Sequence, residues 1–204
     1  MSPLSRRAFT AAALTTLLAG CGGQGTGTGT GTGGRTAPTS TPSSAKSTAP
    51  QGRTVPVRLR IPEIGVDTPV IRLGLASDGT VQVPPVTAHD RAGWYEHSPV
   101  PGRVGPSVIL GHVTVGEYGD GVFRRLGELR RGDRVEARLE NGTTAEFAVT
   151  EVRTVAKADF PADAVYGNVD RPELRLITCG GPRSGAGYRD NVIVFAASMS
   201  SGAR

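Results

Sequence analysis

Cysteine and aromatic residues are scarce in this 204-residue chain. It contains two cysteines, and aromatic residues make up 5% of it. Two cysteines cannot build the set of disulfides that stabilises a mini-protein, and 29 glycines with 15 prolines exclude a coiled coil. Long hydrophobic runs are also missing: the least polar stretch, Ala8–Gly20, has 13 residues, whereas a bilayer-spanning helix needs about 20. No ordinary transmembrane segment is therefore expected, and the length allows one or two domains.

Acidic residues are absent from the first part of the chain. All 18 lie at Glu63 or beyond, so residues 1–52 carry only basic charges. Residues 53–204 hold 19 basic and 18 acidic residues, a net charge of +1 out of the chain's +5. Because a nucleic-acid-binding protein concentrates positive charge on its folded domain, no nucleic-acid partner is expected.

The N-terminus has the parts of a secretory signal peptide: a basic start, a short apolar stretch and small residues after it. Ser5–Phe9 resembles a twin-arginine export signal. Leu18–Cys21 (LAGC) resembles a bacterial lipobox, which implies that Cys21 becomes the lipidated first residue of the mature chain. We expect a signal peptide over residues 1–20 and a lipid-anchored protein on the extracytoplasmic face of the cell membrane. The alternative is an uncleaved amphipathic or buried helix.

Residues 21–52 consist almost entirely of glycine, threonine, serine and proline. Such a segment cannot bury enough apolar surface to offset the entropy lost on ordering, so we predict a disordered tether. The folded domain is then expected over residues 53–204. A tether suits a domain that works at a membrane or wall surface. The segment is equally consistent with a plain spacer.

The predicted domain shows short apolar or alternating runs separated by turn signals, which is typical of an all-β barrel or sandwich. Asn141-Gly142 between two such runs is a strong hairpin signal. Only two short helices are expected, at Phe123–Leu129 and Asp159–Tyr166. The predicted strands are Val55–Ile61, Val66–Leu75, Thr80–Val83, Ser107–Leu110, Arg134–Glu140, Thr143–Val149, Glu173–Ile177 and Asn191–Ala197.

Once Cys21 is assigned to lipid, Cys179 is a lone cysteine in an exported chain. It has three interpretations: a buried small hydrophobic residue, a disulfide partner of Cys21, or a catalytic nucleophile. An apolar run precedes it and Gly180–Pro182 follows it, so we expect the strand to end there. A thiol at a strand end beside an irregular loop is well placed for chemistry.

A thiol nucleophile needs a partner that favours the thiolate or takes its proton. His112 mirrors Cys179, because it follows the dense run Val108–Leu110 with a glycine beside it. His89 and His97 lie in a proline- and glycine-rich stretch and are expected to be ordinary loop histidines.

Arg189 supplies the third chemical group, a permanent positive charge at the start of the last predicted strand. If that strand pairs with the one before Cys179, Arg189 lies near the level of the thiol. There it can donate hydrogen bonds to an oxyanion that develops on a carbonyl group. The alternative is a strand-end arginine paired with a surface carboxylate.

Together these residues resemble the active site of a sortase. Gly111-His112 resembles the histidine motif of that family, Leu176–Cys179 (LITC) its Leu-X-Thr-Cys signature, and Tyr188–Asn191 its arginine-bearing strand start. The similarity spans about residues 55–198. The short loops and the glycines after Cys179 are most similar to actinobacterial sortases of class E or F.

The resemblance implies a closed β-barrel of about eight strands with one or two short helices. It implies a thiol-dependent transpeptidase or peptidase that cuts a Leu-Pro-X-Thr-Gly-like sorting signal between Thr and Gly. Cys179 would form a thioacyl enzyme, His112 would transfer protons, Arg189 would stabilise the oxyanion, and Thr178 would line the substrate pocket. The implied partners are surface proteins with sorting signals and an amine acceptor in peptidoglycan or a pilin. No cofactor and no metal ion are implied.

Other functions stay open. The main alternative is a non-catalytic surface lipoprotein that binds a wall or protein partner and retains sortase-like residues. An L,D-transpeptidase is disfavoured because His112 lies far from Cys179 in the chain, whereas that family has both in one short segment. A metal hydrolase is disfavoured because the histidines show no helical spacing. A lipobox also departs from the transmembrane helix that commonly anchors sortases.

Overall fold

The computed structural model describes residues 54–185 and 187–199. The predicted signal peptide (1–20), the lipid-attachment candidate Cys21 and the predicted tether (21–52) lie outside these residues, as does the residue at which the predicted domain begins.

Most of the described chain is β-strand. Six helical segments are present there, and five of them are single 3₁₀ turns. None of these segments is long and apolar enough to cross a membrane. The strands are β1 (Pro56–Ile61), β2 (Val66–Leu73), β3 (Ala92–Tyr95), β4 (Gly105–Leu110), β5 (Thr114–Val115), β6 (Gly119–Asp120), β7 (Arg134–Leu139), β8 (Thr144–Ala156), β9 (Pro172–Ser184) and β10 (Gly187–Ser198). The helical segments are η1 (Pro62–Ile64), η2 (Val86–Ala88), η3 (Gly116–Tyr118), η4 (Leu126–Glu128), η5 (Lys157–Asp159) and α1 (Ala162–Tyr166).

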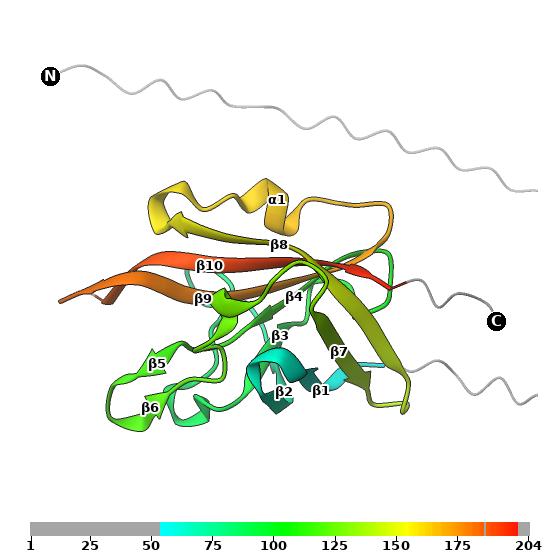
Figure 1. Ribbon diagram of the computed structural model, residues 1–204, viewed down its shortest axis with the longest axis horizontal. Coiled ribbons are helices and arrows are strands. Elements are labelled where there is room, and N and C mark those ends of the chain that lie inside the picture. The colour runs from blue at the N-terminus through cyan, green and yellow to red at the C-terminus, as the bar shows by residue number, and fades with distance from the viewer. Residues whose placement is uncertain (1–53, 186, 200–204) are drawn as a thin grey trace, which may run out of the picture. The chain divides into compact units, whose positions relative to one another are not determined.

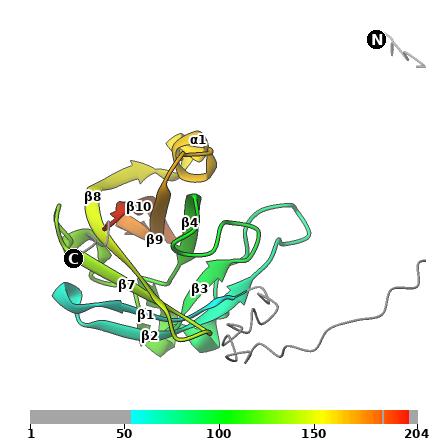
Figure 2. The same cartoon turned by 90° about the vertical axis from the view of Figure 1, so that its right-hand side faces the viewer.

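Eight of the strands close into a barrel, which confirms the predicted fold class. Their order is β1-β2-β3-β4-β9-β10-β8-β7, and β7 pairs back to β1 (Figures 1 and 2). Neighbours are antiparallel except in two parallel pairs, β2 with β3 and β4 with β9. The remaining strands, β5 and β6, form a separate hairpin.

Several strand boundaries differ from the sequence-based expectation. Thr80–Val83 is not a strand: it contributes only one bridge, between Leu75 and Val81, after a turn in which Asp78 accepts hydrogen bonds from Thr80. Conversely, β3 lies in the stretch that was read as loop, where β2 provides a parallel partner. Local composition cannot reveal such pairing, because its hydrogen bonds go to a distant segment.

The expectation that the chain turns directly after Cys179 is wrong. β9 continues to Ser184, and Gly187, Tyr188 and Asp190 of β10 pair with this extension. Gly181 has φ of 71° and lies at a bulge, where two residues of β9 stand opposite Arg189 of β10. Glycine adopts this backbone conformation without steric cost, so the glycine-rich segment bends the strand but does not end it.

The predicted hairpin between β7 and β8 is present, but its turn is not the two-residue Asn-Gly turn in which both residues have positive φ. Only Gly142 has positive φ. The amide of Leu139 donates to the carbonyl of Thr143, and the amide of Gly142 donates to the carbonyl of Leu139, which closes a three-residue loop. Asn141 accepts hydrogen bonds from the backbone and hydroxyl of Thr143. This is the three-residue hairpin with a left-handed glycine at its last loop position.

The barrel interior holds the main core. It comprises alternate residues of the strands together with Phe123, Leu126 and Leu129 from the segment around η4. A second apolar cluster lies on the outside of β4, β9 and β10, where α1 covers it (Figure 2). Its buried members are Val108, Val165, Ile177, Ile193 and Phe195.

A buried arginine fastens the segment around α1 to the barrel. Arg175 is 3% exposed, donates to the carbonyl oxygen of Ala164 in α1, and forms an ion pair with Glu173 at 2.6 Å. Its guanidinium carbon lies 4.7 Å from the centre of the Phe195 ring. These contacts compensate the cost of burying the charge. They also hold α1 against the outer face of β9, the strand that contains Cys179.

Candidate active site

His112 and Cys179 are brought to the same level by two neighbouring parallel strands. In the register of β4 with β9, Leu110 stands opposite Ile177. The amide of Gly111 extends this ladder by donating to the carbonyl of Ile177 at 3.1 Å. His112 follows directly, so the chain reaches it beside the Thr178–Cys179 segment of β9.

Two glycines allow the backbone around His112 to pack closely. A Cβ atom at Gly111 would lie 2.5 Å from the Phe123 ring, and one at Gly121 would lie 2.2 Å from the carbonyl oxygen of His112. The Phe123 amide donates to this same carbonyl at 2.8 Å. The segment around Val122 therefore crosses over His112 and fixes its backbone position.

The imidazole of His112 is half-buried and held by a backbone carbonyl. Its Nε2 atom lies 2.6 Å from the carbonyl oxygen of Pro84, in the connection between β2 and β3. A carbonyl oxygen only accepts hydrogen bonds, so Nε2 carries the proton and donates it. In the neutral ring Nδ1 is then the nitrogen with a free lone pair, and it is the position at which a proton can be taken up.

Cys179 lies in β9, is half-buried and forms no disulfide within the part of the chain that the structure describes. Its neighbour Thr178 stands opposite Val192, a member of the interior core. Because successive side chains of a strand point to opposite faces, Cys179 points to the outside of the barrel, as does Ile177. The disulfide with Cys21 that the sequence left open concerns a residue outside the described ones.

Arg189 is exposed and lies on the same face of β10 as Asn191. Asn191 pairs directly with Cys179 across the two strands. Two residues along β10 toward its start, Arg189 projects to the same side. No ion-pair partner of its guanidinium is present in the described parts of the chain, in contrast to the expected alternative of a strand-end arginine held by a surface carboxylate. The charge is thus free to meet a ligand.

Asn191 was not singled out by sequence reasoning. Its side chain shares the outer face with the thiol, in a directly opposed cross-strand pair, and such pairs have Cβ atoms about 4.5–5.5 Å apart. Only the register between β9 and β10 reveals this proximity, and nothing in the sequence specifies the register before the Gly181 bulge is known.

Thr178 is 4% exposed, and its hydroxyl oxygen is buried without a hydrogen-bond partner among the described residues. It follows the alternation of β9 toward the barrel interior. Its predicted part in lining a substrate pocket stays a prediction. His89 and His97 occupy turns, as expected: the carbonyl of His89 accepts from Val122, and the ring of His97 packs edge-on against Tyr95 at 5.5 Å.

An apolar and aromatic surface borders the face on which Cys179 lies. The partly buried residues of the outer cluster are Tyr95, Leu110, Val155 and Phe160. Tyr166 of α1 packs against the rings of Tyr95 and Phe160, at 6.4 and 6.2 Å. Burial raises the pKa of Tyr166 above its ordinary value of 10.0, and Tyr95 adds to the effect. Tyr166 is therefore neutral at physiological pH, and this aromatic surface suits an apolar ligand segment.

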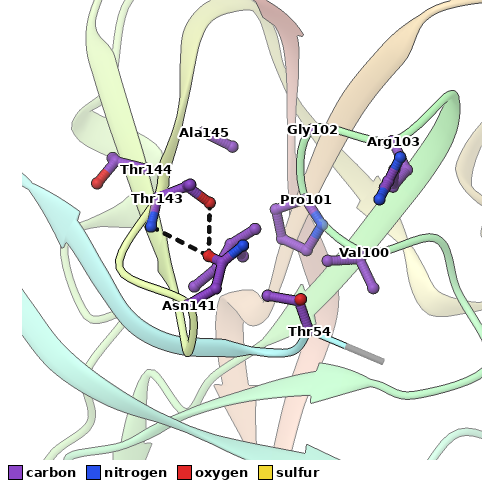
Figure 3. Close-up of a pocket in the computed structure, with 10 residues that line it drawn as sticks. Thr54, Val100, Pro101, Gly102, Arg103, Asn141, Thr143, Thr144 and Ala145 are labelled. Carbon is purple, nitrogen blue, oxygen red and sulfur yellow. Dashed lines mark hydrogen bonds between the residues drawn. The ribbon is translucent and has the colours of Figure 1, made fainter. Parts of the chain in front are cut away.

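A pocket of about 480 Å³ lies away from this chemistry. It is formed by Thr54, the loop around Gly102 and the turn between β7 and β8 (Figure 3). Phe147 of β8, just beyond the turn, pairs with Ser198 of β10, whereas Cys179 pairs with Asn191. The seven steps along β10 from Asn191 to Ser198 span about 23 Å, so the pocket is no part of the candidate site.

The sequence matches the sortase domain family over residues 59–199. The chain belongs to the sortase family. The match covers the barrel with β4, β9 and β10, and hence all four predicted site residues of the domain, His112, Thr178, Cys179 and Arg189.

Solved sortase structures of several classes share this fold. A lid mutant of sortase A from Corynebacterium diphtheriae superimposes with a TM-score of 0.57 at 20% identity, covering 74% of this chain and 73% of that one. Sortase C-1 from Actinomyces oris gives 0.55 at 22% identity, covering 70% and 72%. A Clostridium perfringens sortase D5 transpeptidase gives 0.52 at 23% identity, covering 70% and 78%. No match is found among curated proteins. The predicted sortase-type barrel is thereby confirmed.

Proposed function

We propose that this sortase-family protein is a cysteine transpeptidase that cleaves a Leu-Pro-X-Thr-Gly-like sorting signal between Thr and Gly. The observation that carries the proposal is the convergence of three segments: Cys179 points outward from β9, Arg189 shares its face from β10, and His112 follows the parallel neighbour β4. Family membership supports a transpeptidase function for such a site.

In the first half-reaction Nδ1 of His112 takes the proton of the Cys179 thiol, and the sulfur attacks the carbonyl carbon of the signal's threonine. A C–S bond forms, and the carbonyl electrons move onto oxygen. The Arg189 guanidinium, which is free of carboxylate partners among the described residues, donates hydrogen bonds to this oxyanion. When the C–N bond breaks, the leaving glycine amine takes a proton from His112, and a thioester on Cys179 remains.

In the second half-reaction an amine replaces the thiol. His112, now neutral, accepts a proton from the incoming amine, whose nitrogen attacks the thioester carbonyl and expels the sulfur of Cys179. The hydrogen bond from Nε2 to Pro84 fixes the ring, so both proton transfers pass through Nδ1. The acceptor amine belongs to peptidoglycan or a pilin lysine, and water in its place gives hydrolysis.

The apolar side of the signal needs a neutral surface next to the thiol. Leu110 and Ile177 lead to Cys179 along β4 and β9, and the aromatic group of Tyr95, Phe160 and Tyr166 borders them. We assign this outer surface to the Leu-Pro part of the signal. Burial of such side chains contributes about 25 cal/mol per Å² of apolar area.

The test uses the full chain and a fluorogenic peptide with a Leu-Pro-X-Thr-Gly segment. Cleavage is expected, and hydroxylamine should yield the threonine hydroxamate. Cys179→Ala should abolish both signals, and Arg189→Ala should lower kcat by about 10²–10³. Cys21→Ala is the matched control and should retain full activity. Peptide binding without cleavage by the parent chain would favour the alternative of a non-catalytic surface module, and undiminished cleavage by Cys179→Ala would refute the catalytic role.

We further propose that the protein is held by a lipid on Cys21 at the outer face of the cell membrane, and that it falls within sortase class E or F. The lipobox Leu18–Cys21 supports the first proposal and the glycines after Cys179 support the second. Mass spectrometry of membrane fractions should find a mature chain that begins with a lipid-modified Cys21. Detection of an intact Met1 would exclude lipid anchoring.

A further inference from the structure

One side-chain hydrogen bond joins the two segments that flank Cys179. The hydroxyl oxygens of Thr114 and Tyr188 lie 2.6 Å apart. Thr114 begins β5, two residues after His112, and Tyr188 directly precedes Arg189 in β10. The bond spans 74 residues of sequence and links the hairpin of β5 and β6 to the end of the β9–β10 hairpin on one side of the barrel (Figure 1).

The end of the β9–β10 hairpin has few other fixed neighbours. β10 pairs with β8 only from Asp190 onward, whereas Gly187 and Tyr188 pair with Ser184 and Arg183 of β9. The bulge at Gly181 bends β9 at this level and locally interrupts the ladder. The position of Arg189 relative to the barrel is therefore weakly determined by the sheet itself.

The other hairpin is likewise small. β5 and β6 pair over only two residues each, and Gly121 closes the hairpin by donating to Val113 at 2.9 Å. The Thr114 side chain links this hairpin to Tyr188 of β10, the strand that pairs with β9 at Cys179. Short hairpins with few buried contacts open readily, and a hydrogen bond between two of them opposes this opening.

We propose that the Thr114–Tyr188 hydrogen bond is a latch that sets the spacing between His112 and Arg189 across the thiol of Cys179. The two hydroxyls are positioning groups: they pair with each other and leave the chemistry to the residues beside them. The proposal rests on the proposed transpeptidase function in so far as the spacing serves that reaction. The latch itself is a structural claim that can be tested without substrate.

The kinetic test compares Tyr188→Phe, Thr114→Val and the double variant in the full chain. Each removes a hydroxyl and keeps the side-chain shape, so the fold should persist. We expect kcat to fall about three- to tenfold, the equivalent of one neutral hydrogen bond, with KM unchanged. The double variant should lose no more than either single variant, because the same bond is removed. Thr114→Ser, which keeps the hydroxyl, should retain the parent kcat.

Tyr118→Phe is the matched control. It removes a hydroxyl from the same hairpin region, and that hydroxyl has no hydrogen-bond partner within the described ranges. Its kcat should equal that of the parent. Multiplied losses in the double variant would show that the two hydroxyls act independently and would overturn the latch.

Hydrogen exchange provides the substrate-free test. Exchange of a peptide covering residues 113–122 should be about three- to tenfold faster in Tyr188→Phe, although the substitution lies in another hairpin. Faster exchange in Tyr188→Phe, without a change in Thr114→Ser, would support the latch. This result would hold even if the parent chain cleaved no peptide: the proposed function would then fail and the latch would stand. Unchanged exchange would overturn the latch, and faster exchange with unchanged kcat would overturn its positioning role.

Discussion

At the scale of single residues, the half-buried ring of His112 is oriented by main chain rather than by another side chain. Pro84 lies far away in the sequence, yet its carbonyl accepts the Nε2 proton at 2.6 Å. Pro84 itself is buried, which holds the carbonyl in place. In the proposed reaction, the connection between β2 and β3 therefore decides which ring nitrogen takes up the proton.

This arrangement predicts the tautomer of the free protein. At a pH where His112 is neutral, long-range ¹H–¹⁵N spectra should show the proton on Nε2 and an unprotonated Nδ1. His97, whose ring packs against Tyr95, is the comparison within the same chain. A dominant Nδ1-protonated form of His112 would contradict the assignment of Nδ1 as the proton acceptor.

The sequence pointed to the candidate catalytic residues but not to the groups that hold them. Cys179, His112 and Arg189 each carry a chemical signature and lie near apolar runs, so residue types and order were enough to select them. Pro84 and Asn191 carry no such signature. They enter the site through a main-chain carbonyl and a strand register, which are properties of the folded chain.

At the scale of elements, the bulge in β9 lies directly opposite Arg189 of β10. Gly181 has φ of 71°, and a Cβ atom there would lie within 2 Å of the Asp190 carboxylate. Sequence reasoning took the glycines after Cys179 as the end of a strand. Glycine marks both bulges and turns, and only the presence of a pairing partner distinguishes the two.

Gly181→Ala should therefore destabilise the protein by about 1–3 kcal/mol, since alanine is strained at positive φ and also overlaps Asp190. Denaturant unfolding measures this change. Gly185→Ala is the matched control in the same hairpin, because a Cβ atom there meets nothing within 4 Å. Equal stability of the two variants would show that the bulge conformation is not required.

The segment around α1 depends on a charged pair at the edge of the barrel. Burial raises the pKa of the Glu173 carboxyl, but hydrogen bonds from Arg171 and Arg175 outweigh this and hold the pKa below its ordinary value of 4.5. A carboxyl with a lowered folded pKa stabilises the fold above the unfolded value, and this stabilisation is lost as the pH falls through the folded value.

Glu173→Gln should accordingly lower the free energy of unfolding by about 1–3 kcal/mol at neutral pH, where it removes charged hydrogen bonds to the buried Arg175. The difference from the parent should shrink as the pH falls below 4.5. Denaturant unfolding between pH 7 and about pH 3 tests this. A difference that stays constant over this range would contradict the predicted role of the charge. Arg171→Gln, at an exposed position, should show a smaller effect.

At the scale of the whole molecule, the closed barrel explains why the fold was predictable. Alternating patterns in β1 and β7, the hairpin between β7 and β8, and the dense runs of β4, β9 and β10 all indicate strands. Short elements such as β3 were missed because their stability comes from neighbours such as β2. The barrel places the parallel strands β4 and β9 side by side, and this brings His112 to Cys179 across 67 residues of sequence.

The formation of a thioester on Cys179 tests the account most directly. The full chain is mixed with a Leu-Pro-X-Thr-Gly peptide, quenched in acid, and analysed by intact mass and fragmentation. The account predicts a covalent adduct of the peptide up to its threonine on Cys179, absent from Cys21 and released by hydroxylamine. Turnover of the peptide without any adduct on Cys179, or with the adduct on another residue, would contradict it.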